Sequence, residues 1–164
     1  MNILFLCTGN SCRSILAEAI FNHLAPHGFK AASAGSRPTG FVHPRTLELL
    51  ADEGICHEGY YSKSLDTLTT TPDLIITVCA NAQAEACPVF PGPYLRSHWG
   101  VDDPAQVEGT ETEIKAAFRS SYQILRRRIE AFFALPLHDL KHNPEAFRVQ
   151  LDGIGSLQPD TCHA

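Results

Sequence analysis

The sequence lacks any long apolar run and any excess of positive charge. No stretch of its 164 residues is apolar for long enough to cross a bilayer, so we expect no membrane contact. The formal net charge of -5 argues against a nucleic-acid-binding surface. A basic, apolar leader with a small-residue cleavage site is also missing, which predicts a cytoplasmic protein.

The six cysteines lack the spacing of a metal site. There is no Cys-x2-Cys pair and the histidines are scattered, so we expect no bound metal. Thiols stay reduced in the cytoplasm, and the cysteines therefore indicate catalytic or redox-active thiols rather than a disulfide framework. Cys162 lies near the end of the chain and is interpreted as an incidental thiol.

The apolar pattern alternates between the strand and helix periods. The expected strands are residues 3–6, 30–34, 74–78 and 94–96. The first expected helix carries Leu16, Ile20 and Leu24, and the second begins near Pro44 with Leu47 and Leu50 facing inward. A long helix is expected to begin with a cap formed by Thr110 and Glu113. A short helix should run from Pro144 through Leu151 and be followed by a loose end.

This alternation predicts an α/β protein with a three-layer doubly wound fold around a small central parallel sheet. Ligands of such folds bind beyond the carboxyl ends of the strands. We expect a catalytic domain over residues 1–136 and a C-terminal extension of unknown role over residues 137–164.

The segment that follows the first predicted strand has the pattern of an oxyanion site. Cys7 ends the apolar run, and Gly9 and Asn10 allow a tight backbone path into a helix start. Arg13 adds a planar, positively charged fork. Because these groups favour a thiolate, we expect Cys7 to be ionised at neutral pH and to act as the nucleophile. The predicted oxyanion-binding residues are Thr8, Gly9, Asn10, Ser11, Cys12, Arg13 and Ser14.

Two further cysteines follow the predicted strand 74–78. Cys79 should lie on the same edge of the sheet as Cys7, which makes it a candidate resolving thiol. Cys87 comes eight residues later, and a helix would separate the two α carbons by roughly 12 Å. A disulfide needs them within about 7 Å, so pairing Cys79 with Cys87 would require this segment to melt or loop out.

A third feature is the sequence Asp102-Asp103-Pro104, expected on a loop after a strand. A carboxylic acid there could stand over the oxyanion and protonate a departing oxygen. The same three residues are also common in ordinary turns.

Taken together, these residues resemble the arsenate reductases built on the low-molecular-weight tyrosine phosphatase fold, over about residues 1–135. The resemblance rests on Cys-Thr-Gly-Asn-Ser-Cys-Arg-Ser at 7–14, Ala17-Glu18, Ser33-Ala34-Gly35, Cys79, Cys87-Pro88 and His-Trp-Gly-Val-Asp-Asp-Pro at 98–104. It implies that Cys7 is the nucleophile, that Arg13 and the loop amides hold the oxyanion, and that Asp103 is the acid. It also implies that Ser14 hydrogen-bonds the thiolate and that Asn10 braces the loop.

The resemblance further implies reduction of arsenate to arsenite, for arsenic detoxification, through a relay of three thiols. Cys7 would form the arsenate adduct, Cys79 would attack Cys7, and Cys87 would then attack Cys79. Thioredoxin, or glutathione with glutaredoxin, would reduce the final disulfide, and no bound organic cofactor is needed. Many relatives bind potassium beside the loop through an acidic residue, whereas this chain has Lys63 at the matching place.

Two alternatives remain open. A phosphotyrosine phosphatase would share Cys7, Arg13 and Asp103 and use water for the second step. Phosphatases of this fold usually have a proline at the position of Ile15 and tyrosines at the positions of residues 105–107, which this chain lacks. Hydrolysis also gives Cys79 and Cys87 no role. A redox-switched anion-binding protein would leave Asp103 without a role.

Overall fold

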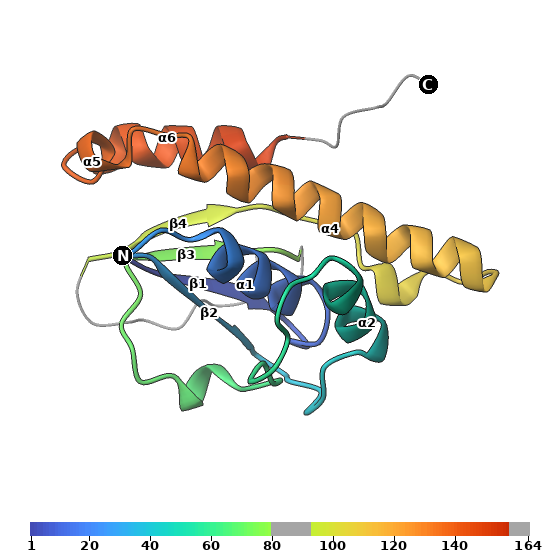
Figure 1. The fold of residues 1–164 in the computed structure, drawn as a ribbon. Coiled ribbons are helices and arrows are strands. Elements are labelled where there is room, and N and C mark those ends of the chain that lie inside the picture. Colours follow the sequence, from blue (N-terminus) through green and yellow to red (C-terminus); the bar gives the residue numbers. More distant parts are fainter. Residues whose placement is uncertain (80–92, 158–164) are drawn as a thin grey trace, which may run out of the picture.

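The structure, a computed structural model, describes residues 1–79 and 93–157. Within these residues, parallel strands form one sheet in the order β2-β1-β3-β4, and their arrows point the same way in Figure 1. The strands are β1 (Asn2–Cys7), β2 (Lys30–Gly35), β3 (Leu74–Thr77) and β4 (Leu95–His98). The predicted α/β class with a small parallel sheet is thus confirmed.

The register of the sheet brings the ends of its strands to a common edge. Cys7 at the end of β1 is paired with Gly35 at the end of β2. Thr77 at the end of β3 is paired with Leu6 on one side and with His98 on the other. Cys79, two residues beyond Thr77, therefore leaves the sheet beside Cys7, as the sequence predicts.

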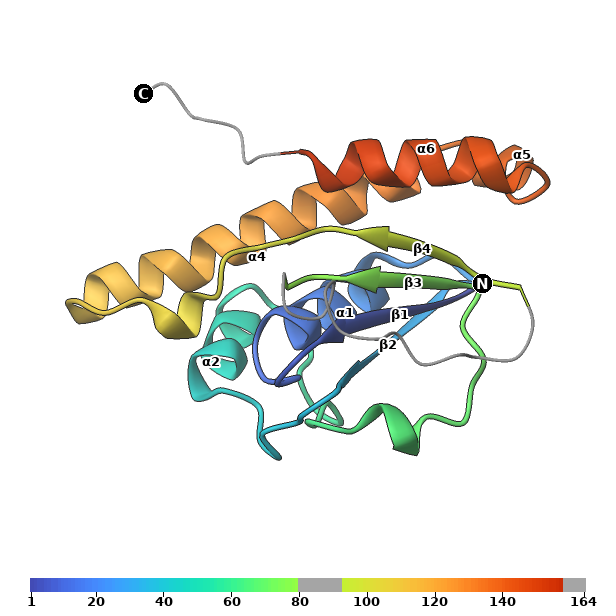
Figure 2. The same cartoon turned by 180° about the vertical axis from the view of Figure 1, so that it is seen from behind.

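Helices connect and follow the strands. They are α1 (Arg13–Leu24), α2 (Pro44–Asp52), α4 (Glu111–Phe133), α5 (Leu137–Leu140) and α6 (Pro144–Gly155), with short 3-10 turns η1 (Leu65–Thr67) and η2 (Pro104–Gln106). Figure 1 shows α4 and α6 above the sheet, and Figure 2, from behind, shows β4 as the strand nearest to α6. None of the helices in the described ranges is long and apolar enough to cross a membrane.

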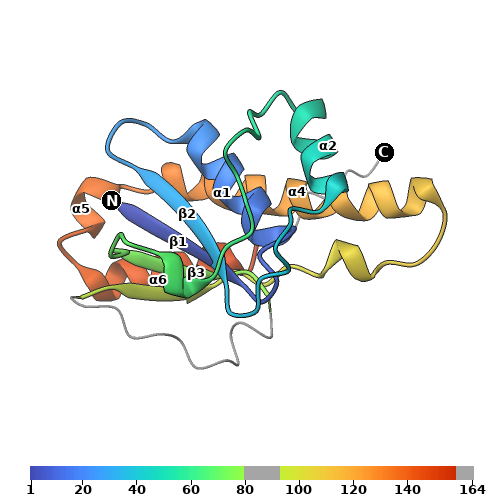
Figure 3. The same ribbon diagram turned by 90° about the horizontal axis from the view of Figure 1, so that it is seen from below.

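The two faces of the sheet are packed unequally, because side chains alternate along each strand. Ile3 and Phe5 of β1 face the larger core, which they share with α1, α4 and α6. Leu4 and Leu6 face a smaller cluster on the other side, and Figure 3 shows η1 lying on that side of the sheet. All of β3 is buried, as expected for a central parallel strand.

The predicted start of α4 matches the structure, whereas the buried side of α2 and the end of β4 differ from the prediction. Thr110 accepts a hydrogen bond from the Glu113 amide at 3.2 Å, so α4 begins where the capping pattern predicts. In α2, Leu49 is buried together with Leu50, whereas Leu47, predicted to face inward, is only half-buried. β4 continues to His98 instead of ending near residue 96, because Thr77 extends the pairing of β3.

The end of the chain is more ordered than its sequence suggests. Asn143 accepts a hydrogen bond from the Ala146 amide at 3.2 Å, which confirms the predicted cap of α6. The helix then continues to Gly155 rather than ending at Leu151 in a loose segment. Phe147, Leu151 and Ile154 are buried in the larger core, and this burial supports the extra turn.

Candidate active site

Cys7 lies where β1 leaves the sheet, and the following loop packs directly on the end of β2. A side chain at Gly35 would place its Cβ atom 2.5 Å from the carbonyl oxygen of Thr8. Only glycine therefore allows this approach of strand and loop. Asn10 turns the chain with a φ of 46°, a left-handed conformation that asparagine tolerates better than most residues.

Carbonyl groups of this loop accept hydrogen bonds from the segment that follows β2, on the outer side of the loop. The amides of Arg37, Thr39 and His43 donate hydrogen bonds of 3.0 Å each to the carbonyl oxygens of residues 8, 9 and 11. Because the peptide group is planar, an outward carbonyl turns the next N–H group inward. The Gly9 amide accordingly donates to the Cys7 sulfur. The inward direction of the Gly9 amide thus has a structural cause in the segment that follows β2, and the rest of the predicted ring of amides stays a prediction.

Asn10 braces this loop through its side chain, as expected from the resemblance. Its amide nitrogen donates to the hydroxyls of Ser14 at 2.8 Å and Ser33 at 2.9 Å. Its side-chain oxygen accepts from the Lys63 amide at 2.8 Å. The hydrogen bond that the structure gives Ser14 is therefore with Asn10, and a bond from Ser14 to the thiolate stays a prediction.

Arg13 and Asp103 meet above this loop. Nη1 of Arg13 donates to the carbonyl oxygen of Val101 at 2.9 Å, and Nη2 lies 3.4 Å from Oδ2 of Asp103. The other Asp103 oxygen accepts from the Ala105 amide at 3.0 Å. The Nε atom of Arg13 is buried and has no hydrogen-bond partner among the described residues. Such a donor suits the oxygen of a bound anion.

The structure brings Cys79 into hydrogen-bonding contact with Cys7, although 71 residues separate them in the chain. Both sulfurs are buried, and the Thr8 hydroxyl lies 3.6 Å from the sulfur of Cys79. A resolving thiol needs such proximity to the sulfur that it attacks. Cys87 and Cys162 lie outside the described residues.

The ionisation of Cys7 differs from the sequence expectation. Its hydrogen bond to Cys79 and its burial raise the pKa of the Cys7 thiol, while Arg13 and the Gly9 amide lower it. The raising influences prevail in this conformation, whereas the sequence argument expects a thiolate at neutral pH. The sequence argument counted the local positive field but not the neighbouring thiol or the depth of burial.

We expect the Cys79→Ala variant to show a lower pKa for Cys7, because it removes the largest raising influence and leaves Arg13 in place. The pH at which iodoacetamide alkylates Cys7 at half its maximal rate should fall. Peptide mapping by mass spectrometry identifies the modified residue. Cys56→Ser is the control, since Cys56 is exposed. An unchanged midpoint in Cys79→Ala would contradict the proposed coupling of the two thiols.

Two residues near Cys79 were not identified from the sequence as part of the site. The Thr77 hydroxyl lies 2.7 Å from Nδ1 of His98, and His98 interacts electrostatically with Cys79. Burial lowers the pKa of His98. The sequence signals were that Thr77 lies in the predicted strand 74–78 and that His98 begins the motif at 98–104.

A buried ion pair lies behind the loop, next to Asn10. Nζ of Lys63 is 3.7 Å from Oε2 of Glu18, and both side chains are at most 10% exposed. Ser33 donates a hydrogen bond to the same Glu18 oxygen. Burial raises the pKa of Glu18, while Ser33 and Lys63 oppose this shift. The Lys63 ammonium group therefore lies beside the oxyanion loop, paired with Glu18.

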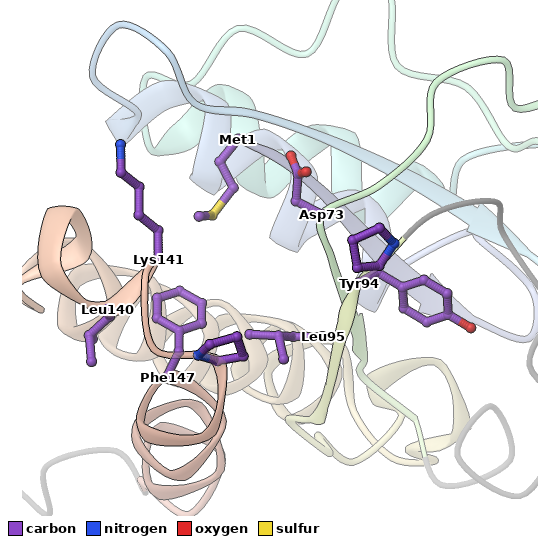
Figure 4. Close-up of a pocket in the computed structure, with 9 residues that line it drawn as sticks. Met1, Asp73, Tyr94, Leu95, Leu140, Lys141 and Phe147 are labelled. Atoms are coloured by element: carbon purple, nitrogen blue, oxygen red, sulfur yellow. The ribbon is translucent and has the colours of Figure 1, made fainter.

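A cavity of about 540 Å³ lies far from these thiols, at the amino ends of the strands. Figure 4 shows Met1, Asp73 and Leu95 on its sheet side and Leu140, Lys141 and Phe147 on the side of α5 and α6. Because Met1 precedes β1 and Cys7 ends it, the cavity is separate from the oxyanion loop.

Comparisons with known proteins agree with this geometry. The family model of the low molecular weight phosphotyrosine protein phosphatases matches residues 2–145. An arsenate reductase of Halalkalibacterium halodurans is 39% identical over 131 residues, which cover 79% of this chain and 93% of the relative.

Solved structures of arsenate reductases are also similar. That from Archaeoglobus fulgidus is 28% identical with a TM-score of 0.60, over 78% of this chain and 98% of that one. The thioredoxin-dependent enzyme of Corynebacterium glutamicum is 28% identical with a TM-score of 0.54, over 79% and 61%. The chain belongs to the low molecular weight phosphotyrosine protein phosphatase family, the family whose fold these arsenate reductases share.

Proposed function

We propose that this chain reduces arsenate to arsenite with three of its own thiols. The chain is an arsenate reductase of the low molecular weight phosphotyrosine phosphatase family, similar to curated enzymes of that name along most of its length. The loop after β1 binds the oxyanion through its amides and Arg13. Its partners in this function are arsenate and a thiol reductant in the cytoplasm.

The first step forms a bond between sulfur and arsenic. The proton of the Cys7 thiol passes to an oxygen of the bound arsenate, and the sulfur attacks arsenic, while Asp103 protonates the departing hydroxyl, which leaves as water. The Cys79 thiol then attacks the sulfur of Cys7, and its proton passes to an oxygen of the arsenic adduct. The electron pair of the sulfur–arsenic bond passes to arsenic, arsenite is released, and a Cys7–Cys79 disulfide forms.

Cys87 completes the cycle by attacking Cys79, which releases Cys7 and leaves a Cys79–Cys87 disulfide. Thioredoxin is the proposed reductant of this bond, because the Corynebacterium glutamicum relative is named as thioredoxin-dependent. Glutathione with glutaredoxin is the alternative from the sequence. No bound cofactor is part of this scheme.

The contact between the sulfurs of Cys7 and Cys79 is the observation that carries the proposal. Hydrolysis of a phosphate ester needs Cys7, Arg13 and Asp103 together with water, and it gives a second buried thiol no task. Reductive release of arsenite needs a sulfur within reach of Cys7. The contact of Cys79 with Cys7 supports this role.

The test is to measure NADPH consumption on addition of arsenate, with thioredoxin and thioredoxin reductase or with glutathione and glutaredoxin. Hydrolysis of an aryl phosphate is measured in parallel. We expect arsenate-dependent consumption with at least one of the two reductants. Aryl phosphate hydrolysis without arsenate-dependent consumption would instead make the chain a phosphatase, and activity in neither assay would indicate a sensor.

Turnover should be insensitive to potassium, because Lys63 already supplies a positive charge beside Glu18. Replacing potassium by sodium at constant ionic strength is expected to change kcat/KM by less than about twofold, since a buried ammonium is an intrinsic part of the fold. Initial rates of arsenate reduction in the two buffers measure this. A several-fold stimulation by potassium would contradict it.

A further inference from the structure

The C-terminal helix α6 lies almost wholly beyond the family match, which ends at residue 145. It nevertheless reaches the loop that carries Asp103. In Figure 1, α6 runs along the upper side of the sheet toward the edge at which the strands end. We propose that α6 and the two residues that follow it, Ser156 and Leu157, position the loop from Trp99 to Asp103, so that Asp103 can donate its proton. This rests on the proposed function, in which Asp103 is the acid.

The first contact joins α6 to the beginning of the Asp103 loop. Trp99 is fully buried, and its indole N–H group donates to the carbonyl oxygen of Leu151 at 3.0 Å. Two residues earlier, in β4, the Ser97 hydroxyl donates to Asp152 at 2.8 Å. The strand end and the start of the loop are thus bonded to two consecutive residues of α6.

The second contact is a close backbone approach at the end of α6. A Cβ atom at Gly155 would lie 2.4 Å from the carbonyl oxygen of His98 and 2.8 Å from the Trp99 ring. Any side chain at this position must push the helix and the loop apart, because the obstructing oxygen belongs to the backbone. Gly153, on the same helix, has no atom within 4 Å of the corresponding point.

The third contact passes through a buried guanidinium on α4. Arg128 is 2% exposed, and its Nη1 atom donates to the carbonyl oxygens of Trp99 at 2.9 Å and Gly100 at 3.1 Å. Its Nε atom donates to the carbonyl oxygen of Leu157 at 3.1 Å. A buried charge is tolerated when hydrogen bonds satisfy it, so Arg128 holds the loop and the end of the chain together.

These contacts end immediately before the catalytic part of the loop. Val101, next after Gly100, accepts the hydrogen bond from Arg13, and Asp103 follows two residues later. A shift of the backbone at residues 98–100 is therefore expected to displace Asp103, which follows three residues after Gly100. Misplacement of a reacting group by about 1 Å can cost about 10²-fold in rate, so small shifts at this point affect catalysis.

The experiment compares Gly155→Ala with Gly153→Ala. Both changes replace glycine by the better helix former within α6, and only Gly155→Ala places a methyl group against the loop. We expect kcat for arsenate to fall roughly tenfold in Gly155→Ala, through displacement of the acid, and to stay unchanged in Gly153→Ala. Alkylation of Cys7 should proceed at the wild-type rate in both, since the thiol loop is untouched.

A double-mutant cycle separates positioning from a merely structural role. If α6 acts through Asp103, Gly155→Ala in an Asp103→Asn background should lower kcat by less than about twofold further. Equal losses in both backgrounds, or no loss in either, would overturn the proposal. If Gly155→Ala fails to fold, Ser97→Ala enters the same cycle, because it removes the hydrogen bond to Asp152 of α6 with little change in side-chain volume.

Failure of the proposed function would be visible separately, in the wild-type chain. If wild type hydrolyses an aryl phosphate and does not reduce arsenate, the cycle is measured with the aryl phosphate, whose leaving oxygen Asp103 also protonates. The ratio of kcat between Gly155→Ala and its parent, in each background, then still tests whether α6 positions Asp103. A wild-type chain that turns over neither oxyanion would contradict both proposals.

Discussion

The Cys79→Ser variant is expected to lose arsenate reduction by at least about 10³-fold, as is typical when an essential nucleophile is removed. A serine hydroxyl at this position can still contact Cys7, but it cannot form a disulfide with it. The sulfur–arsenic adduct would then form once and release no arsenite. Steady-state NADPH consumption with arsenate and the active reductant measures the loss.

The same variant should keep any hydrolysis of aryl phosphates, because the oxyanion loop, Arg13 and Asp103 are unchanged. Cys56→Ser is the matched control for loss of a thiol, since Cys56 is exposed and lies after α2. It should reduce arsenate at the wild-type rate. Wild-type turnover in Cys79→Ser would contradict the relay, whatever the rate of the control.

Arg13→Lys should lower kcat/KM for arsenate by about 10²- to 10³-fold, the usual cost of losing one donor to a developing oxyanion. Lysine keeps the charge but not the planar fork, so it cannot bind Val101, Asp103 and an anion oxygen together. Initial rates over a range of arsenate concentrations separate the losses in kcat and KM.

Arg119→Lys provides the control for this substitution. Arg119 pairs with Glu53 at 2.6 Å on the surface and is half-exposed, so its exchange for lysine should change kcat/KM by less than about twofold. If Arg13→Lys behaves like Arg119→Lys, the guanidinium of Arg13 does not hold the oxyanion.

Much of the site could be predicted from sequence because its parts follow from local rules. The order of strand, Cys7, glycine, asparagine and Arg13 predicts a loop at a helix start, and the structure has it there. The convergence of Cys79 on Cys7 follows from one property of parallel sheets, that carboxyl ends share an edge. Neither inference needed knowledge of side-chain packing.

The features that could not be predicted depend on packing between distant segments. The pKa of Cys7 is raised by burial and by a neighbour 72 residues away, and neither is visible in the local motif. The contact of Arg128 with the Leu157 carbonyl depends on where α6 ends, and the sequence pattern predicts an end of α6 one turn earlier than the structure shows. Leu49, and not Leu47, is buried in the core because α4 packs against the side of α2 that carries Leu49. The sequence of α2 alone does not show where α4 packs.

The central claim is that the sulfurs of Cys7 and Cys79 become joined when arsenate is reduced. The most direct test treats the Cys87→Ser variant with arsenate in the absence of reductant and analyses its peptides by mass spectrometry. We predict a disulfide between the peptide that contains Cys7 and the peptide that contains Cys79, together with one arsenite released per chain. Arsenite release with both thiols still reduced, or no reaction of this variant with arsenate, would contradict the account.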